Sequence, residues 1–106
     1  MVNAMTDEQI TELINRRRRQ ILVHSVIYYT YDDSIISDYT WSKWAQELAE
    51  LQQQYPSIAA NCVFADDFKG FDPSTGFDLP LDDPWAVRKA QHLLDMRDRG
   101  LIGGKK

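Results

Sequence analysis

The chain of 106 residues has one cysteine, two histidines and five glycines, and each scarcity excludes a class of protein. Cys62 alone cannot form an internal disulfide, so we expect a reducing, cytoplasmic setting. Together with His24 and His92 it gives none of the usual metal-ligand spacings, and we expect no metal site. The glycines form neither a phosphate-binding loop nor a Gly-x-Ser-x-Gly elbow. No catalytic constellation is therefore predicted.

Long apolar runs and a strong excess of one charge are also missing. No stretch approaches the roughly 20 apolar residues of a membrane-spanning helix, and the N-terminus lacks the apolar region of a signal peptide. The net charge of -4 gives no general attraction to nucleic acid or to a membrane surface. We expect neither as a partner, and a homo-oligomer stays open.

What the chain does have is apolar and aromatic side chains. Hydrophobic residues make up 43% of it, including three Trp, five Tyr and four Phe, which is typical of a folded protein and not of a disordered tail. The length suits one domain with a real core. We predict a single domain over residues 1–106, of the all-α class.

The first predicted helix runs from Thr6 to about Tyr29. Thr6 and Gln9 have the spacing of a capping box, in which each side chain satisfies a free amide at the helix start. Apolar residues then recur every three to four positions and become more frequent after residue 20. The second half of this helix should therefore be the more buried.

Four consecutive arginines, residues 16–19, form the strongest basic run. Successive residues of a helix point about 100° apart, so the four cannot make one patch. The simpler interpretation is a solvated collar whose stems cover apolar surface. The alternative is that one or two of them, with Arg17 as the candidate, face a phosphate or an acidic partner.

A turn and a second helix should complete a helical hairpin over residues 6–55. Asp32, Asp33 and Ser34 are turn-forming residues. Either Ser37 or Asp38 should cap the second helix. That helix has one apolar face and stops at Tyr55, because the following proline disfavours helical geometry there.

The remainder should cover this hairpin. Residues 57–68 are apolar and are predicted as a short helix, with a strand as the open alternative. Residues 69–82 contain two Gly and two Pro and read as a loop laid on the body through Phe71, Phe77, Leu79 and Leu81. Asp83 and Pro84 should begin a bracing helix over 84–98. The tail 103–106 should be mobile.

Several residues around the turn have a structural and a functional interpretation. One of Tyr28 and Tyr29 is expected to be a core aromatic. Trp41 and Trp44 share a helical face that is more typical of core, with Trp41 the better pocket candidate. Asp38 could be a helix cap, and a helix start is also a good place to hold a phosphate.

Residues 28–56 resemble the small N-terminal helical domain of bacterial NAD-dependent DNA ligases. The family pattern has a Tyr pair or Tyr-His, an acidic turn, Ile-Ser-Asp, Tyr-Asp, Glu-Leu-x-x-Leu and His-Pro or a similar pair. His24 also falls where the family often has His; its spacing alone is typical of a packed helix residue, but the resemblance implies that it lines the ligand pocket. The counterparts here, without a gap, are Tyr28-Tyr29, Asp32-Asp33, Ile36-Ser37-Asp38, Trp41-Ser42, Glu47-Leu48-Ala49-Glu50-Leu51 and Tyr55-Pro56.

In those ligases this domain closes over the nicotinamide mononucleotide half of NAD. The resemblance implies that Tyr28 and Tyr29 sandwich a nicotinamide ring and that Asp38 binds the ribose. Two positions depart from the pattern, since Trp41 replaces a tyrosine and Ser42 an aspartate. Trp41 can still stack on a flat ring, whereas Ser42 lacks the charge. The implied ligands are NAD, nicotinamide mononucleotide or a related nucleotide, with no catalytic cofactor.

The chemistry of a ligase is missing from these 106 residues. The nucleotidyl-transfer motif Lys-x-Asp-Gly does not occur, and residues 69–72, Lys-Gly-Phe-Asp, are not a substitute. The zinc-binding cysteines of a ligase are missing as well. The resemblance thus implies a stand-alone, non-catalytic relative of the type found in phages and mobile elements.

Two functions follow. The first is a module that recognises a nicotinamide- or adenine-type nucleotide through Tyr28, Tyr29, Trp41 and Asp38, with Arg17 near the phosphate, used by a phage in counter-defence. The second is a protein-interaction module, such as an inhibitor of a host defence enzyme, that keeps the hairpin only as a scaffold. The retained tyrosines and Ile-Ser-Asp favour the first, and the changes at residues 41 and 42 favour the second.

Overall fold

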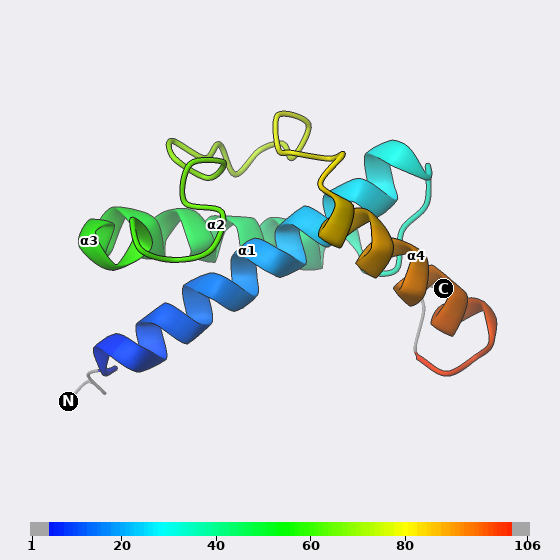
Figure 1. Cartoon of the computed structure of the whole chain (residues 1–106), viewed down its shortest axis with the longest axis horizontal. Helices are drawn as coiled ribbons and strands as arrows, with labels where there is room; N and C mark the ends of the chain where they lie inside the picture. The colour runs from blue at the N-terminus through cyan, green and yellow to red at the C-terminus, as the bar shows by residue number, and fades with distance from the viewer. Residues whose placement is uncertain (1–4, 103–106) are drawn as a thin grey trace.

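The computed structural model describes residues 5–102 and shows an all-helical protein, which confirms the predicted fold class (Figure 1). The expected mobile tail lies outside the described residues. The four helices are α1 (Asp7–Thr30), α2 (Asp38–Gln54), α3 (Pro56–Ala59) and α4 (Pro84–Asp98). Figure 1 shows α2 running back along α1, and the segment after α3 following this pair to α4. No described helix is long and apolar enough to cross a membrane.

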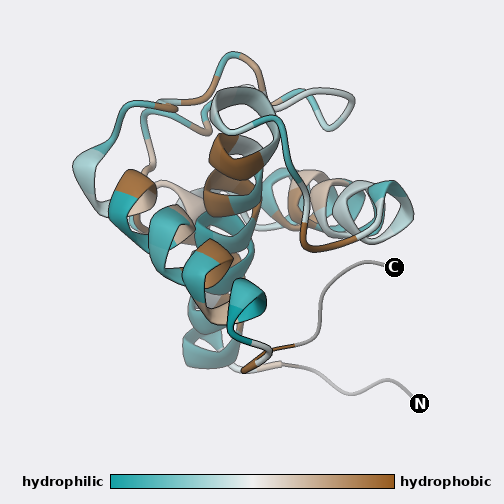
Figure 2. Ribbon diagram, turned by 90° about the vertical axis from the view of Figure 1, so that its right-hand side faces the viewer, coloured by the Kyte–Doolittle hydropathy of each residue, from teal (hydrophilic) through white to brown (hydrophobic). Residues whose placement is uncertain are grey.

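Helix α1 is the centre of the fold and contacts each of the other three helices. Its capping box is present: Thr6 Oγ1 accepts a hydrogen bond from the Gln9 amide at 3.1 Å, and the Thr6 amide donates to Gln9 Oε1 at 2.9 Å. The more buried second half is confirmed, because Ile21, Leu22 and Val26 have no exposed surface. Figure 2 shows the hydrophobic turns of α1 in this half.

The turn between α1 and α2 settles which residue caps the second helix. Ser37 is the N-cap, and its Oγ accepts a hydrogen bond from the Thr40 amide at 3.1 Å. Asp38 is therefore the first residue of α2, and the alternative that made it the cap is wrong. Its carboxylate is not used for capping. Tyr55 is the C-cap, so the predicted end of the helix is confirmed.

The prediction of a helix over residues 57–68 is wrong for most of its length. Only Pro56–Ala59 form α3, the chain then continues in turns, and the strand alternative is not observed there. Phe68 at the end of these turns is fully buried. Its aromatic ring anchors a segment whose short turns do not extend into a helix.

The following loop lies on the body, as predicted. Leu79 is buried, and Phe71 and Leu81 are half-buried against the core, whereas Phe77 is 66% exposed. Helix α4 begins as expected: Asp83 Oδ2 accepts a hydrogen bond from the Ala86 amide at 2.9 Å, and proline occupies the first helical position. Ala86 and Ala90 are fully buried, and α4 packs on α1.

Candidate functional site

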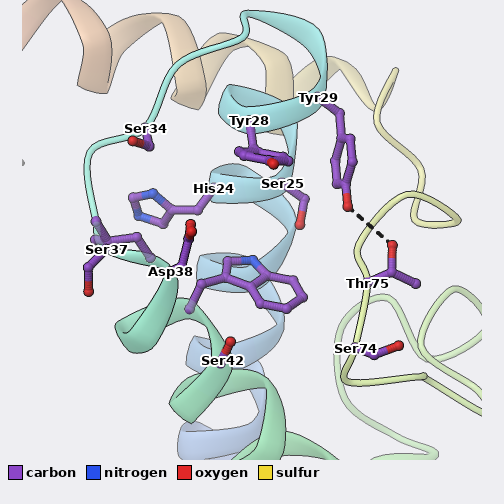
Figure 3. Close-up of a pocket in the computed structure, with 12 residues that line it drawn as sticks. His24, Ser25, Tyr28, Tyr29, Ser34, Ser37, Asp38, Ser42, Ser74 and Thr75 are labelled. Carbon is purple, nitrogen blue, oxygen red and sulfur yellow. Dashed lines mark hydrogen bonds between the residues drawn. The ribbon is translucent and has the colours of Figure 1, made fainter.

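A cavity of about 200 Å³ lies where α1, the turn, α2 and the loop meet (Figure 3). Helix α1 contributes His24, Ser25, Tyr28 and Tyr29 to its lining, the turn Ser34, Ile36 and Ser37, helix α2 Asp38, Trp41 and Ser42, and the loop Ser74 and Thr75. Five of the six predicted site residues are in this set, and Arg17 is the exception. The structure thus brings together residues from positions 24 to 75.

Helix periodicity explains why these side chains meet. Residues 24, 25, 28 and 29 are one turn apart and lie on one face of α1. Residues 38, 41 and 42 do the same in the first turns of α2. Figure 3 shows His24 on the side of α1 toward Ser37 and Asp38, and Ser25 and Tyr29 on the side toward the loop that carries Ser74 and Thr75. The short turn places the last turns of α1 beside the first turns of α2.

The two tyrosines are both exposed, so the expectation that one of them is a core aromatic is wrong. Tyr28 is 55% exposed and Tyr29 39% exposed. Their rings meet edge to face with centroids 4.9 Å apart. Tyr29 is held by the loop, through a hydrogen bond of 3.1 Å between its hydroxyl and Thr75 Oγ1 and an edge contact with Phe77. Tyr28 is the more accessible of the two rings.

Two buried polar atoms of the lining have no hydrogen-bond partner among the residues that the structure describes. They are Nδ1 of His24 and Oγ of Ser25, and the Ser25 side chain is 1% exposed. Unsatisfied buried polar atoms are rare in folded proteins, so each one calls for an explanation. Burial lowers the pKa of His24 from 6.5 to about 4, and its imidazole is therefore neutral at pH 7. His24 therefore brings no positive charge to the lining at pH 7.

Arg17 lies away from this cavity. Its Nε donates to Glu47 Oε1 at 2.6 Å and its Nη1 donates to Gln20 Oε1 at 2.7 Å. The guanidinium also stacks over Trp44, 5.5 Å from the ring centroid. Its charge is thus already engaged with a carboxylate and an aromatic ring.

Arg18 corrects the expectation of a solvated arginine collar. The residue is 2% exposed, although its neighbours Arg16 and Arg19 are exposed. Its Nε donates to Gln52 Oε1 and its Nη1 to the Val63 carbonyl, both at 2.9 Å. Arg18 therefore joins α1 to α2 and to the segment after α3, and does not line the cavity.

Sequence reasoning missed the contribution of the loop to this site. Gly76 is buried directly over Ser25 and Trp41: a Cβ added there would overlap Ser25 Oγ and lie 3.2 Å from Trp41 Cζ2. Only glycine leaves room for so close an approach. A turn at Asp72, whose Oδ1 accepts hydrogen bonds from Ser74, shapes this part of the loop. The glycine after Ser-Thr was the sequence feature that could have indicated it.

Metal chemistry finds no support in the described residues, because no three His, Cys, Asp or Glu side chains lie close enough to hold an ion. The site is instead a small cavity with aromatic, hydroxyl and carboxylate groups.

The helical hairpin is similar to one known family. The model of the family described as "DNA ligase-like, N-terminal NAD+-binding domain" matches residues 7–61. The match therefore extends over the whole of α1, beyond the resemblance seen over residues 28–56. A DNA ligase of Pseudothermotoga lettingae is 39% identical over 51 residues, which are 48% of this chain and 8% of that protein. A DNA ligase of Fervidobacterium nodosum is 32% identical over 54 residues, 51% of this chain and 8% of that protein.

The chain thus spans under a tenth of the length of these relatives. No solved structure matches it. The matched residues include every cavity-lining residue except the two from the loop. Since the match covers more than half of the chain, the protein belongs to the family of DNA ligase-like N-terminal NAD+-binding domains.

Proposed function

We propose that this protein is a nucleotide-binding module that takes the nicotinamide end of NAD or of nicotinamide mononucleotide in the cavity beside Tyr28. The observation that carries the proposal is the cavity itself: an exposed aromatic ring, that of Tyr28, lines it together with Trp41 and the carboxylate residue Asp38. A flat ring would stack on the Tyr28 ring, and Asp38 would accept hydrogen bonds from the polar groups attached to it. The family to which the chain belongs is named for binding NAD+.

The size of the cavity favours part of a dinucleotide. Pockets that enclose a whole drug-sized ligand measure roughly 300–1,000 Å³, and this one measures about 200 Å³. One six-membered ring and part of a ribose fit this space, so the rest of the nucleotide would lie outside. Tyr28 and Trp41 supply aromatic faces from two helices. Asp38 would accept hydrogen bonds from the ribose hydroxyls.

We propose further that these 106 residues bind the nucleotide without transferring it. The sequence has no Lys-x-Asp-Gly motif, and so no lysine in the setting that the ligase reaction needs. His24 and Asp38 line the cavity, but in the described part of the chain neither side chain is hydrogen-bonded to a hydroxyl group that it could activate. A phage-borne role in counter-defence stays a prediction.

The second candidate is a protein-interaction module, and one observation favours it. Phe77, Tyr28 and Tyr29 form a continuous set of aromatic contacts on the surface, and Phe77 is 66% exposed. Exposed aromatic groups of this type are common in protein interfaces. Inhibition of a host defence enzyme through this surface stays a prediction as well.

Calorimetric titration with NAD+, nicotinamide mononucleotide and ADP-ribose tests the first candidate. We expect micromolar binding of the two nicotinamide ligands and a loss of about tenfold or more in Tyr28→Ala, because stacking on an aromatic ring is worth about 1–3 kcal/mol. Tyr39→Ala is the matched control, since Tyr39 is 72% exposed and outside the cavity. Absence of heat with all three ligands, from protein shown to be folded, would refute the proposal and direct the search to a protein partner.

A further inference from the structure

We propose that residues 72–78 form a flap that opens from the hairpin as a unit, and that the buried hydroxyl of Ser25 keeps the closed position of this flap only marginally stable. The flap lies outside residues 7–61 and is therefore not part of the family match. It forms one wall of the cavity through Ser74 and Thr75. Its opening would let a ligand enter and leave on that side, and this consequence alone rests on the proposed function.

The two ends of the flap are fixed to the body of the protein. Phe71 contacts the fully buried Phe68, with ring centroids 5.2 Å apart. Leu79 is 8% exposed and belongs to the core. Between these anchors only Gly76 is buried, and it has no side chain. Burial of apolar side chains is the main interaction that holds a segment to a core, so the flap is held much less firmly than its ends.

The hydrogen bonds of the flap hold it together but hardly attach it to the hairpin. Asp72 Oδ1 accepts hydrogen bonds from the amide and the hydroxyl of Ser74, at 2.9 and 2.7 Å. Thr75 Oγ1 accepts one from the Phe77 amide at 3.1 Å. In the described part of the chain, one hydrogen bond joins the flap to the hairpin, the 3.1 Å bond between the Tyr29 hydroxyl and Thr75 Oγ1 (Figure 3). That bond is exposed, so water competes for both hydroxyl groups.

The closed flap buries a polar atom without satisfying it. Ser25 is 1% exposed, and its Oγ has no hydrogen-bond partner within residues 5–102. Gly76 lies so close to this oxygen that a Cβ at residue 76 would overlap it. A buried hydroxyl without a partner destabilises the closed position, because water can hydrogen-bond to it once the flap opens. Ser25 therefore opposes closure, and glycine at position 76 makes closure possible.

The contacts that favour closure are small. The Phe77 ring meets the Tyr29 ring edge to face, with centroids 5.5 Å apart, but Phe77 remains 66% exposed. Gly76 packs on the edge of the Trp41 ring without a side chain of its own. Little apolar surface is thus buried in exchange for the unsatisfied hydroxyl. The open and closed positions should therefore lie close together in free energy.

Hydrogen exchange of the Gly76 amide, in protein without ligand, tests the flap because this buried residue is uncovered when the flap opens. The rate is compared with that of Leu22, a fully buried residue of α1, so that changes in global stability cancel. We expect Gly76 to exchange at least about a hundredfold faster than Leu22. Equal rates would show that only global unfolding releases the segment and would overturn the proposal.

Ser25→Ala tests the role of the buried hydroxyl. It should slow the exchange of Gly76 about tenfold relative to Leu22, because the closed position no longer contains an unsatisfied polar atom. Ser42→Ala is the matched control, since it makes the same change at an exposed position of α2 and should leave the ratio as in the wild type. The same ratio in both variants would overturn the role given to Ser25.

Tyr29→Phe tests the bond that holds the flap closed. The change keeps the aromatic ring and removes the hydroxyl that bonds to Thr75, so the exchange of Gly76 should rise about threefold relative to Leu22. Tyr28→Phe, at the neighbouring tyrosine, should leave the ratio unchanged. An equal ratio in the two variants would show that this bond does not hold the flap.

The exchange measurement and the nucleotide titration can fail independently. If Gly76 exchanges as expected but the folded protein binds neither NAD+ nor nicotinamide mononucleotide, the proposed function is wrong and the flap remains. If the nucleotides bind and Gly76 exchanges as slowly as Leu22, the flap is wrong and the proposed function remains.

Discussion

Arg18 is a buried charge that joins three segments, and within residues 5–102 it has no carboxylate partner. Its guanidinium donates to Gln52 Oε1 and to the Val63 carbonyl, and Gln52 Nε2 in turn donates to the Phe68 carbonyl at 3.1 Å. The centroid of the Phe68 ring lies 5.7 Å from the guanidinium carbon. Burial lowers the pKa of Arg18, because water no longer solvates the charge. The hydrogen bonds to the two amide oxygens offset part of the free-energy cost of burying the charge.

We predict that Arg18→Ala lowers the free energy of unfolding by about 3 kcal/mol, because it leaves buried acceptors without donors and a space in the core. Arg19→Ala is the matched control from the same run, and its effect should stay within about 0.5 kcal/mol. Urea denaturation followed by circular dichroism measures both. Similar losses in the two variants would contradict the network described for Arg18.

His24 should make the stability of the protein depend on pH. Burial lowers its pKa from 6.5 to about 4, so between these values the unfolded chain binds a proton that the folded chain does not. The unfolded state is therefore stabilised relative to the folded state as the pH falls. We expect this histidine to reduce the free energy of unfolding by up to about 3 kcal/mol between pH 6.5 and pH 4.

The check is the pH dependence of denaturation in His24→Gln, which should be flatter than that of the wild type in this range. His92→Gln, at an exposed position on α4, should keep the wild-type slope. An unchanged slope in His24→Gln would show that other groups cause the acid sensitivity.

At the scale of elements, the loop after α3 closes the candidate site by lying against both arms of the hairpin. Gly76 is buried over Ser25 of α1 and Trp41 of α2. A hydrogen bond between the hydroxyl groups of Tyr29 and Thr75 also connects α1 to the loop. A loop that looks like a connection in the sequence is therefore part of the cavity wall.

We predict that Gly76→Ala destabilises the protein by about 1–3 kcal/mol, because the new methyl group overlaps Ser25 Oγ and pushes the loop outward. The same change should weaken binding of nicotinamide mononucleotide, the ligand of the proposed function. Ser25→Ala removes the overlapped oxygen, so the double variant should lose less than the sum of the two single variants. Denaturation of the four proteins gives this comparison, and strict additivity would contradict the close contact.

At the scale of the molecule, α1 is the element to which everything else is attached. Helices α2 and α4 pack on it, but in the described part of the chain no residues of α2 and α4 have Cα atoms within 8 Å of each other. An ion pair between Arg97 and Asp33, which are 64 positions apart in the chain, also attaches α4 to the turn between α1 and α2. Arg97 Nη1 and Nη2 donate to Asp33 Oδ1 and Oδ2, each at 2.9 Å. Hydrogen bonds from Arg97 are the main reason why the pKa of Asp33 lies below its usual 3.8.

We predict that Asp33→Asn lowers the Tm at pH 7 by detaching the end of α4 from the turn. The lowered pKa of Asp33 means that the ion pair stabilises the folded state above pH 3.8 and is lost as the pH falls through the folded-state pKa. The difference in Tm between wild type and variant should therefore shrink as the solution is acidified to pH 2. Asp32→Asn, at the neighbouring exposed aspartate, is the control. A difference that persists at pH 2 would rule out the ion pair as its cause.

The sequence by itself determined α1, α2 and α4 and most of their ends, but not the extent of α3. The Thr6 capping box, the stop before Pro56 and the start at Asp83-Pro84 depend on hydrogen bonds and steric clashes between residues that are neighbours in the chain. Such interactions can be read without knowing the fold. The helical spacing of His24, Tyr28 and Tyr29 likewise set them on one face of α1.

Only the tertiary structure decided how these elements meet. Which arginine is buried depends on the packing of residues 52, 63 and 68 around Arg18, and four identical neighbours in the sequence cannot show it. The exposure of Tyr28 and Tyr29, and the closure of the cavity by Gly76, likewise depend on segments about 50 residues apart in the chain. Contacts between distant segments depend on the three-dimensional path of the chain, and local propensities do not specify that path.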